Sequence, residues 1–314
     1  MAVGVKQPQG GQGDGAGIAG IADIAGGPAD AAMFDGARGL QSDPASVEQV
    51  ETGLLLEGIY QVHGADLRGH ARGPLMQRLQ RFMQQEGVAT ISALQDRILH
   101  ARPAAEALVQ ALFLRPASLF GDTGRLAALR AAMVPYLRSC PLPKIWIAES
   151  TCSEDVFALV ILLIEEGLYD KTLIFVTAAD DRLLARARFG QFPLHRLGEY
   201  ESNYLRCGGT ATLVDYCRER HGQMEFLPHC RPNLIWAKYD LATDRSFNEF
   251  QLIVCQRVLP EFGVPLQRRA LRLFADSLSP FGLLCVDGPQ AMTGTAAAQF
   301  QAVDPAQGLF RRTV

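Results

Sequence analysis

Hydrophobic and polar positions change their pattern twice along the chain, which divides it into three regions. Residues 1–45 are rich in Gly, Ala, Asp, Gln and Pro and hold few large apolar side chains. Residues 46–140 carry apolar side chains at spacings of three and four, which is the period of an amphipathic helix. From residue 141, short apolar runs alternate with helical segments, a pattern typical of a mainly parallel sheet with covering helices.

The first two regions are predicted to be a disordered tail and a helical domain. A segment as polar and Gly-rich as residues 1–45 cannot bury enough apolar surface to offset the entropy lost on folding. The helical domain, residues 46–140, is predicted to contain five helices. One apolar stripe is interpreted as core packing rather than as a groove for a partner: Leu75, Leu79, Phe82 and Met83.

The third region, residues 141–290, is predicted to be a Rossmann-like α/β domain. Strands are expected at 145–148, 172–177, 234–239, 250–254 and 283–286, with helices at 154–166, 182–189 and 265–278. The stretch from about 199 to 232 lacks this alternation and contains a Gly208-Gly209 break, so we expect a small inserted subdomain there. Residues 291–314 are polar and are expected to form a loose C-terminal tail.

Composition excludes several classes of function. The net charge is −3 and no long Lys/Arg block occurs, so nucleic acid is not an expected partner. No apolar run reaches the roughly 18 residues of a membrane span, and no secretory signal pattern is found, so we expect a cytoplasmic protein without membrane insertion.

The seven cysteines are scattered, as expected for reduced thiols in a cytoplasm. One group of potential zinc ligands clusters in sequence: Cys207, Cys217, His221, His229 and Cys230. Because this group contains no CxxC pair, free thiols are favoured over a zinc site, and no metal is predicted.

Four stretches, taken in order, carry a family resemblance. They are GADLRGH (64–70) with LMQRLQRFMQQEG (75–87), LFGD (119–122) with LRAAMVPYLR (129–138), LLARARFGQFPLHRL (183–197), and FQLIVCQRVLPEF (250–262). Together they resemble the CheR family of chemotaxis-receptor methyltransferases over roughly residues 53–288. The resemblance implies a small helical domain and an α/β domain that uses S-adenosylmethionine to methylate glutamate side chains.

The first cofactor turn departs from the family pattern. The family's turn looks like AGCSTGEEPYS, whereas residues 148–158 read AESTCSEDVFA, so both glycines are replaced, by Glu149 and Ser153. Glycine allows a ligand to approach the backbone closely, and a bulky carboxylate at position 149 opposes this. Glu154 still matches the family's first glutamate; its alternative role is to stabilise the helix N-terminus through the dipole.

The resemblance implies three further cofactor contacts. The family's aspartate that accepts from the ribose hydroxyls is Ala178 here, and Asp180 can replace it or can instead cap the following helix. The family's His-Asn-Leu near the adenine reads Tyr239-Asp240-Leu241. The predicted cofactor residues are therefore Glu154, Asp180, Asp240 and Leu241. The predicted cofactor is S-adenosylmethionine, with no cofactor at all as the alternative.

The acceptor side also departs from the pattern. In the family's Thr-x-Phe-Phe-Arg-Asp motif the threonine and the arginine approach the methyl group and the acceptor, and these positions are Ala117 and Gly121 here. Arg115 or Arg257 can stand in for the arginine. A glutamate acceptor is already ionised at neutral pH, so the reaction depends on binding and placement rather than on an acid or base. No catalytic residue is predicted.

These losses favour a CheR-like protein that is catalytically impaired and acts as a protein-binding component of bacterial signalling. Its expected partner is a chemoreceptor-like or other signalling protein, met through Arg72, Arg78 and Arg81; the alternative for these residues is a solvated helix face. Two other functions remain open. One is an active, divergent methyltransferase of protein glutamates, and the other is a scaffold that recruits partners through residues 1–45.

Overall fold

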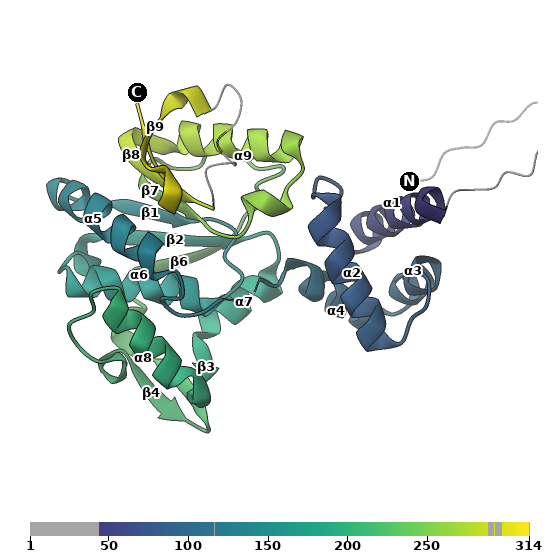
Figure 1. The fold of residues 1–314 in the computed structure, drawn as a ribbon, viewed down its shortest axis with the longest axis horizontal. Helices are drawn as coiled ribbons and strands as arrows, with labels where there is room; N and C mark the ends of the chain where they lie inside the picture. Colours follow the sequence, from purple (N-terminus) through teal and green to yellow (C-terminus); the bar gives the residue numbers. More distant parts are fainter. Residues whose placement is uncertain (1–43, 116, 288–291, 293–296, 314) are drawn as a thin grey trace, which may run out of the picture. The chain divides into compact units, whose positions relative to one another are not determined.

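The computed structural model describes residues 44–115, 117–287, 292 and 297–313, which belong to one compact unit, Asp43–Val314. It begins with four helices: α1 (Pro44–His63), α2 (Arg72–Glu86), α3 (Ile91–His100) and α4 (Arg102–Phe113) (Figure 1). These helices share a core that contains Leu75, Leu79 and Phe82, with Met83 packed against it, so the prediction for this stripe is confirmed. Val50 and Leu54 of α1 have helical spacing too but remain exposed.

A seven-stranded sheet forms the centre of the α/β domain. Its parallel strands are β1 (Lys144–Ile147), β2 (Leu173–Ala178), β6 (Leu234–Lys238), β7 (Phe250–Cys255) and β8 (Leu278–Val286). The strand order is β6-β2-β1-β7-β8-β10-β9, and β10 (Leu309–Arg312) is antiparallel to both β8 and β9 (Phe300–Asp304). The predicted Rossmann-like fold is confirmed. Because the order reverses at β1, the carboxyl ends of β1 and β7 border the crevice where such sheets bind ligands.

The two faces of the sheet are covered by different helices. Ile145 and Ile147 of β1 pack in one core with α5 (Thr123–Ser139) and α6 (Ser153–Glu165). Trp146 points to the opposite face and packs in a second core with α9 (Val264–Ser277) (Figure 1). This alternation is the side-chain period of a strand. Over its described length, the chain has no helix that is long and apolar enough to cross a membrane.

Contacts at the end of β7 fasten the helical domain to the α/β domain. Glu261, in the turn after β7, accepts hydrogen bonds from Arg78 of α2 and from Nε of Arg115, which follows α4. Two backbone hydrogen bonds run alongside, from Ala71 N to the Glu261 carbonyl (2.7 Å) and from Gly263 N to the Gly69 carbonyl (2.8 Å). The Arg115 and Glu261 side chains are only 3% and 12% exposed. The charged cluster is therefore largely desolvated.

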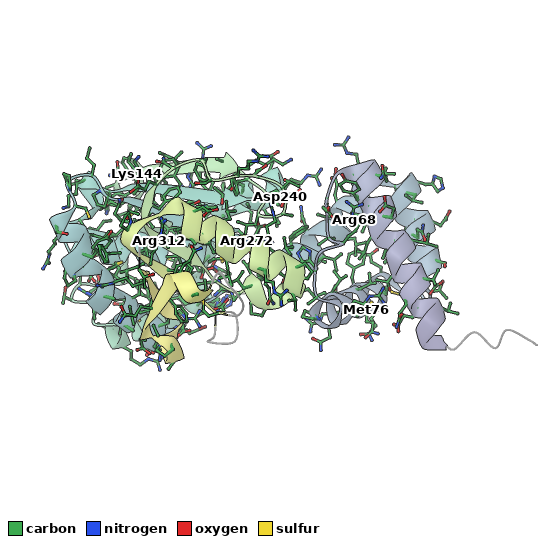
Figure 2. All side chains as sticks on the ribbon, turned by 90° about the horizontal axis from the view of Figure 1, so that it is seen from above. Arg68, Met76, Lys144, Asp240, Arg272 and Arg312 are labelled. Carbon is green, nitrogen blue, oxygen red and sulfur yellow. The ribbon has the colours of Figure 1, made fainter. Side chains whose placement is uncertain are left out.

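The same boundary continues toward the carboxyl end of β6. Figure 2 labels Arg68 on the helical side and Asp240 on the α/β side. Asp66, which pairs with Arg68, lines a cavity together with Asp240. The helical domain therefore forms one wall of the crevice at the edge of the sheet.

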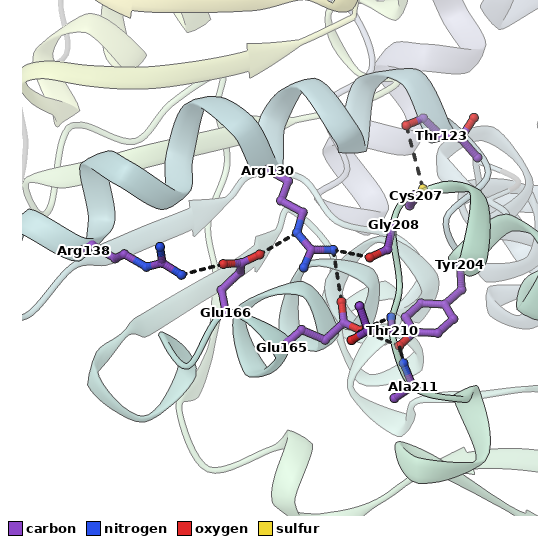
Figure 3. A network of polar contacts seen from close by, with 10 residues as sticks. All are labelled: Thr123, Arg130, Arg138, Glu165, Glu166, Tyr204, Cys207, Gly208, Thr210 and Ala211. Atoms are coloured by element: carbon purple, nitrogen blue, oxygen red, sulfur yellow. Dashed lines mark hydrogen bonds and ion pairs between the residues drawn. The ribbon is translucent and has the colours of Figure 1, made fainter.

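The insert predicted at about 199–232 is more regular than expected from the sequence. It contains most of α8 (Leu197–Arg206) and the strands β4 (Cys217–Arg220) and β5 (Gln223–Phe226), which form a small sheet with the preceding β3 (Gln191–Pro193). The helix predicted at 182–189 is α7 (Asp181–Phe189). Arg130 of α5 pairs with Glu165 and Glu166 of the α6 end and donates to the Gly208 carbonyl at 3.0 Å (Figure 3). Tyr204 of α8 donates to Glu165. This network holds the insert against α5 and α6.

The two predicted tails have different outcomes. The disordered tail predicted for residues 1–45 lies outside the described residues, except that Pro44 and Ala45 begin α1. The loose tail predicted for 291–314 is wrong for residues 300–312, which supply β9 and β10 to the main sheet. Both strands are at most five residues long and expose polar side chains, so their buried Phe300, Leu309 and Phe310 produce only a weak alternation.

We expect Glu261→Ala to lower the free energy of unfolding by about 3–5 kcal/mol, because it leaves the buried Arg115 guanidinium without its carboxylate. Glu106→Ala is the matched control. Glu106 also lies between two arginines, Arg102 and Arg182, but at the surface, so its loss is expected to cost less than about 1 kcal/mol. Urea unfolding followed by circular dichroism gives both values. Equal losses would contradict a special role for the buried cluster.

Candidate functional site

The turn between β1 and α6 keeps the backbone of a glycine turn although it contains no glycine. Glu149 has a left-handed φ of 53°, a conformation that costs an L-residue about 1–2 kcal/mol relative to glycine. The turn is anchored to the end of β2 by a hydrogen bond of 2.8 Å from Ser150 N to the Thr177 carbonyl. The neighbouring contacts therefore hold the strained residue in place, and its side chain projects where a glycine turn is open.

The Glu149 carboxylate is directed toward the end of β2. Its Oε1 accepts a hydrogen bond from the backbone N–H of Ala179 at 3.3 Å. Burial raises the pKa of Glu149 to about 7, and the nearby Arg115 opposes that shift. A carboxylate thus lies beside position 178, where the resemblance expects an aspartate and the chain has alanine.

Three cavities follow the carboxyl edge of the sheet. The first has a volume of about 70 Å³ and is lined by Glu149, Ala179, Asp180, Asp240 and Leu241, and by residues of the helical domain. The second, about 10 Å³, lies against the turn itself and is bordered by Glu149, Ser150, Thr151, Arg115 and Arg257. The third, about 440 Å³, lies between the start of α5 and the end of β7 and is bordered by Ala117, Gly121 and Gln256.

The structure brings together three of the four predicted cofactor residues. Asp180, Asp240 and Leu241 all line the 70 Å³ cavity. Asp180 also caps α7, so the two roles proposed for it are compatible. Burial raises the pKa of Asp240. Glu154 lies elsewhere: it accepts a hydrogen bond from the Tyr200 hydroxyl at 3.2 Å and is absent from the linings of these three cavities.

The volumes at the turn do not fit S-adenosylmethionine. Sites for ligands of this size have volumes of about 300–1,000 Å³. The cleft offers about 70 Å³ beside Asp240 and about 10 Å³ at the turn. The side chain of Glu149 borders both of these spaces. With Glu149 placed as it is, the space at the turn and beside Asp240 is smaller than a ligand of this size occupies.

The arginines predicted to bind a partner are not equivalent. Arg72 and Arg81 are exposed on α2. Arg78 donates to Glu261 and to the Leu112 carbonyl, and its side chain is 21% exposed. Arg78 thus joins two parts of the chain. The partner-binding role of these residues stays a prediction.

Two residues at the boundary between the domains have roles that the sequence did not reveal. The His70 ring packs edge-on against Phe113 and Phe262, with centroids 5.7 and 5.2 Å away, and burial lowers its pKa to about 4. Arg115 is buried beside Glu261, whereas the sequence suggested it only as a substitute for a missing arginine. Both lie in loops, where no periodicity marks a residue as buried.

The cysteines of the cysteine-rich segment are free thiols. Burial raises the pKa of Cys217 to about 12 and that of Cys230 to about 11, and Cys217 Sγ donates to the Leu213 carbonyl at 3.0 Å. Among the described residues, no group of three or more His, Cys, Asp or Glu side chains is arranged to hold a metal ion.

Comparisons with known proteins match both domains. Residues 51–113 match the family model described as "CheR methyltransferase, all-alpha domain", and residues 118–308 match "CheR methyltransferase, SAM binding domain". A Pseudomonas putida protein named "Putative methyltransferase Cher3" is 34% identical over 265 residues, covering 84% of this chain and 97% of that protein. A "Chemotaxis protein methyltransferase" of Listeria innocua is 22% identical and covers 74% and 87%.

The fold is also similar to solved methyltransferase structures. One is the N-methyltransferase NodS of Bradyrhizobium japonicum in complex with S-adenosylhomocysteine, with a TM-score of 0.34 and 13% identity. The match covers 62% of this chain and 88% of that one.

We expect Glu149→Gln to change how stability depends on pH. The pKa is raised from 4.5 to about 7 in the folded protein, so the contribution of Glu149 is fully present below about pH 4.5 and is lost as the pH rises through 7. Glutamine undergoes no such loss. The free energy of unfolding of the variant should therefore increase by about 3 kcal/mol relative to that of the wild type as the pH rises from about 4.5 to about 8.

Urea unfolding at a series of pH values measures this difference. Glu249→Gln, at an exposed position, is measured alongside as the control. A difference curve for Glu149→Gln that does not change with pH would mean that the Glu149 carboxylate is not buried.

Proposed function

Because the chain belongs to the CheR methyltransferase family, we propose that it is a member that no longer transfers methyl groups and acts by binding another signalling protein. The observation that carries this proposal is the buried Glu149 side chain in the turn after β1, which borders both the 70 Å³ and the 10 Å³ cavity. Ala117 and Gly121, in place of a threonine and an arginine, support it from the acceptor side, because placement alone accounts for a large part of such catalysis.

The proposed partner is a chemoreceptor or another protein of bacterial signalling, met in the cytoplasm. Arg72 and Arg81 are exposed on α2 and give that surface a positive charge. Positive surface charge favours encounter with an acidic partner. Arg78 contributes less directly, because its guanidinium is already paired with Glu261.

A second candidate function rests on the same carboxylate. Glu149 Oε1 lies 3.3 Å from Ala179 N, directly after position 178, and borders one cavity together with Asp180 and Asp240. A carboxylate at that place can accept hydrogen bonds from ribose hydroxyls once the side chain shifts. The chain would then be an active, divergent methyltransferase of protein glutamates in which Glu149 replaces the missing aspartate.

Isothermal titration of the full chain with S-adenosylmethionine and S-adenosylhomocysteine tests both candidates. We expect no binding by the wild type up to about millimolar ligand. We expect at least about tenfold tighter binding by the double variant Glu149→Gly, Ser153→Gly, because the backbone at 149 already has the conformation that glycine prefers.

The second candidate predicts the reverse result, with micromolar binding by the wild type that Glu149→Gly abolishes. Micromolar binding by the wild type overturns the first proposal. Glu154→Ala is the matched control within the turn. Because Glu154 contacts Tyr200 rather than the cavities, the binding of neither ligand should change in this variant.

Deleting residues 1–45 tests the scaffold alternative. If the folded part binds the partner, the deletion variant should still capture it.

A further inference from the structure

Helix α1 carries apolar side chains on two faces. One face is buried in the core of the helical domain and consists of Thr52, Leu55, Leu56 and Ile59. Val47, Val50 and Leu54 are instead 42%, 59% and 55% exposed. Their spacings of three and four place them on one stripe, and at about 100° per residue this stripe points away from the buried face. These three residues, here called the α1 stripe, are therefore not the rim of the core.

A glycine beside the stripe leaves this surface open. Gly53 lies one turn after Val50, and a Cβ built on it would meet no described atom within 4 Å. Glycine destabilises the interior of a helix relative to alanine, and no contact within the described residues requires its small size here. A position without a side chain allows the backbone of a second helix to approach α1 closely.

Carboxylates border the α1 stripe. Glu51 is four residues after Val47 and three before Leu54, so it lies beside both. Its Oε1 accepts hydrogen bonds from the backbone N–H and the hydroxyl of Ser92. Both donors are uncharged, so they do not neutralise Glu51. Glu57 follows three residues after Leu54, on the same side of the helix.

The charge around α1 stays negative when the neighbouring arginines are counted. Arg68 pairs with Glu57 at 2.9 Å but also with Asp66 at 2.9 Å. Arg72 donates to the Gln49 carbonyl at 3.4 Å. The carboxylates on or beside α1 outnumber these two guanidiniums, and they are Glu48, Glu51, Glu57 and Asp66. Because complementary charges select the partner at an interface, this surface favours one with Lys or Arg beside its apolar residues.

The same charges oppose other occupants. A second copy of this chain would bring its own Glu51 and Glu57 against those of the first, and α1 contains no Lys or Arg to offset them. Residues 1–43, which precede α1, contain more aspartates than basic residues, so their charge has the same sign. The anionic surface of a membrane is repelled as well.

We propose that the α1 stripe binds a basic, amphipathic helix of a partner protein. Helices pack through apolar side chains at spacings of three and four, and flanking Lys or Arg side chains would pair with Glu51 and Glu57. From Val47 to Leu54 the stripe spans about two turns, or about 10 Å, so it matches a partner helix of about three turns. This surface goes beyond the function proposed above, because it involves neither the crevice nor the binding of an acidic partner.

Fluorescence anisotropy of a labelled peptide mixed with the full chain tests this surface. The probe is a peptide of about 20 residues, with leucine at alternating spacings of three and four and lysine elsewhere. We expect a dissociation constant of about 100 µM or tighter at low salt. The double variant Val50→Ser, Leu54→Ser should weaken binding at least about tenfold, because it removes two apolar anchors. Val264→Ser, which removes an exposed valine from α9, is the matched control and should bind like the wild type.

Two single variants test the shape and the charge of the surface separately. Gly53→Gln adds a side chain whose Cβ meets no described atom, so the variant should fold and should bind the peptide at least about fivefold more weakly. It keeps the proposal testable should the double variant fail to fold. Glu51→Gln retains an oxygen for Ser92 and should weaken binding about threefold at low salt.

Three results would overturn the proposal or its assignment. No binding up to about 1 mM, or equal binding by the wild type and the double variant, overturns the proposal. Equal binding of the same peptide with glutamate in place of lysine overturns the assignment to a basic partner. Self-association of the full chain that the double variant abolishes would assign the α1 stripe to a second copy. Because no cofactor is present in these experiments, their result is independent of the S-adenosylmethionine titration.

Discussion

The rest of the structure depends on one carboxylate that two arginines share. Glu261 projects from the turn after β7 and holds Arg78 of α2 and Arg115 of the segment after α4. These are the contacts that position the helical domain as a wall of the crevice. They also fix Arg115 beside the β1–α6 turn, where its charge acts on Glu149. The stability of the domain boundary and the electrostatics of the cleft thus have a common origin.

In the turn after β1, the backbone keeps the conformation of a glycine turn although its residues are not those that let a ligand approach closely. Ile145 and Trp146 pack into opposite cores of the sheet, so β1 and α6 are required by folding alone. The backbone between them retains its left-handed residue even though that residue is glutamate. Packing preserves the shape of the turn, whereas nothing in packing preserves the glycine.

Much of the architecture was predictable because it rests on periodicity. The stripe on α2, the strand Lys144–Ile147 and the helix Ser153–Glu165 all follow from regular spacing of apolar residues. The short strands β9 and β10 were missed because so few residues alternate in each. In the candidate site, the family resemblance indicated Asp180, Asp240 and Leu241, and the topology of the sheet brings them together at one cavity. The sequence could not reveal the burial of Arg115 or the packing of His70 against Phe262, because both depend on contacts between distant segments.

The left-handed backbone of Glu149 has a consequence for the history of the protein. Codons for glutamate and glycine differ at a single base, and the turn already has the conformation that glycine adopts without strain. A change to glycine at this position therefore requires one mutational step and no rearrangement of the backbone. In evolutionary terms, a turn with glycine in it lies one base change away from this chain.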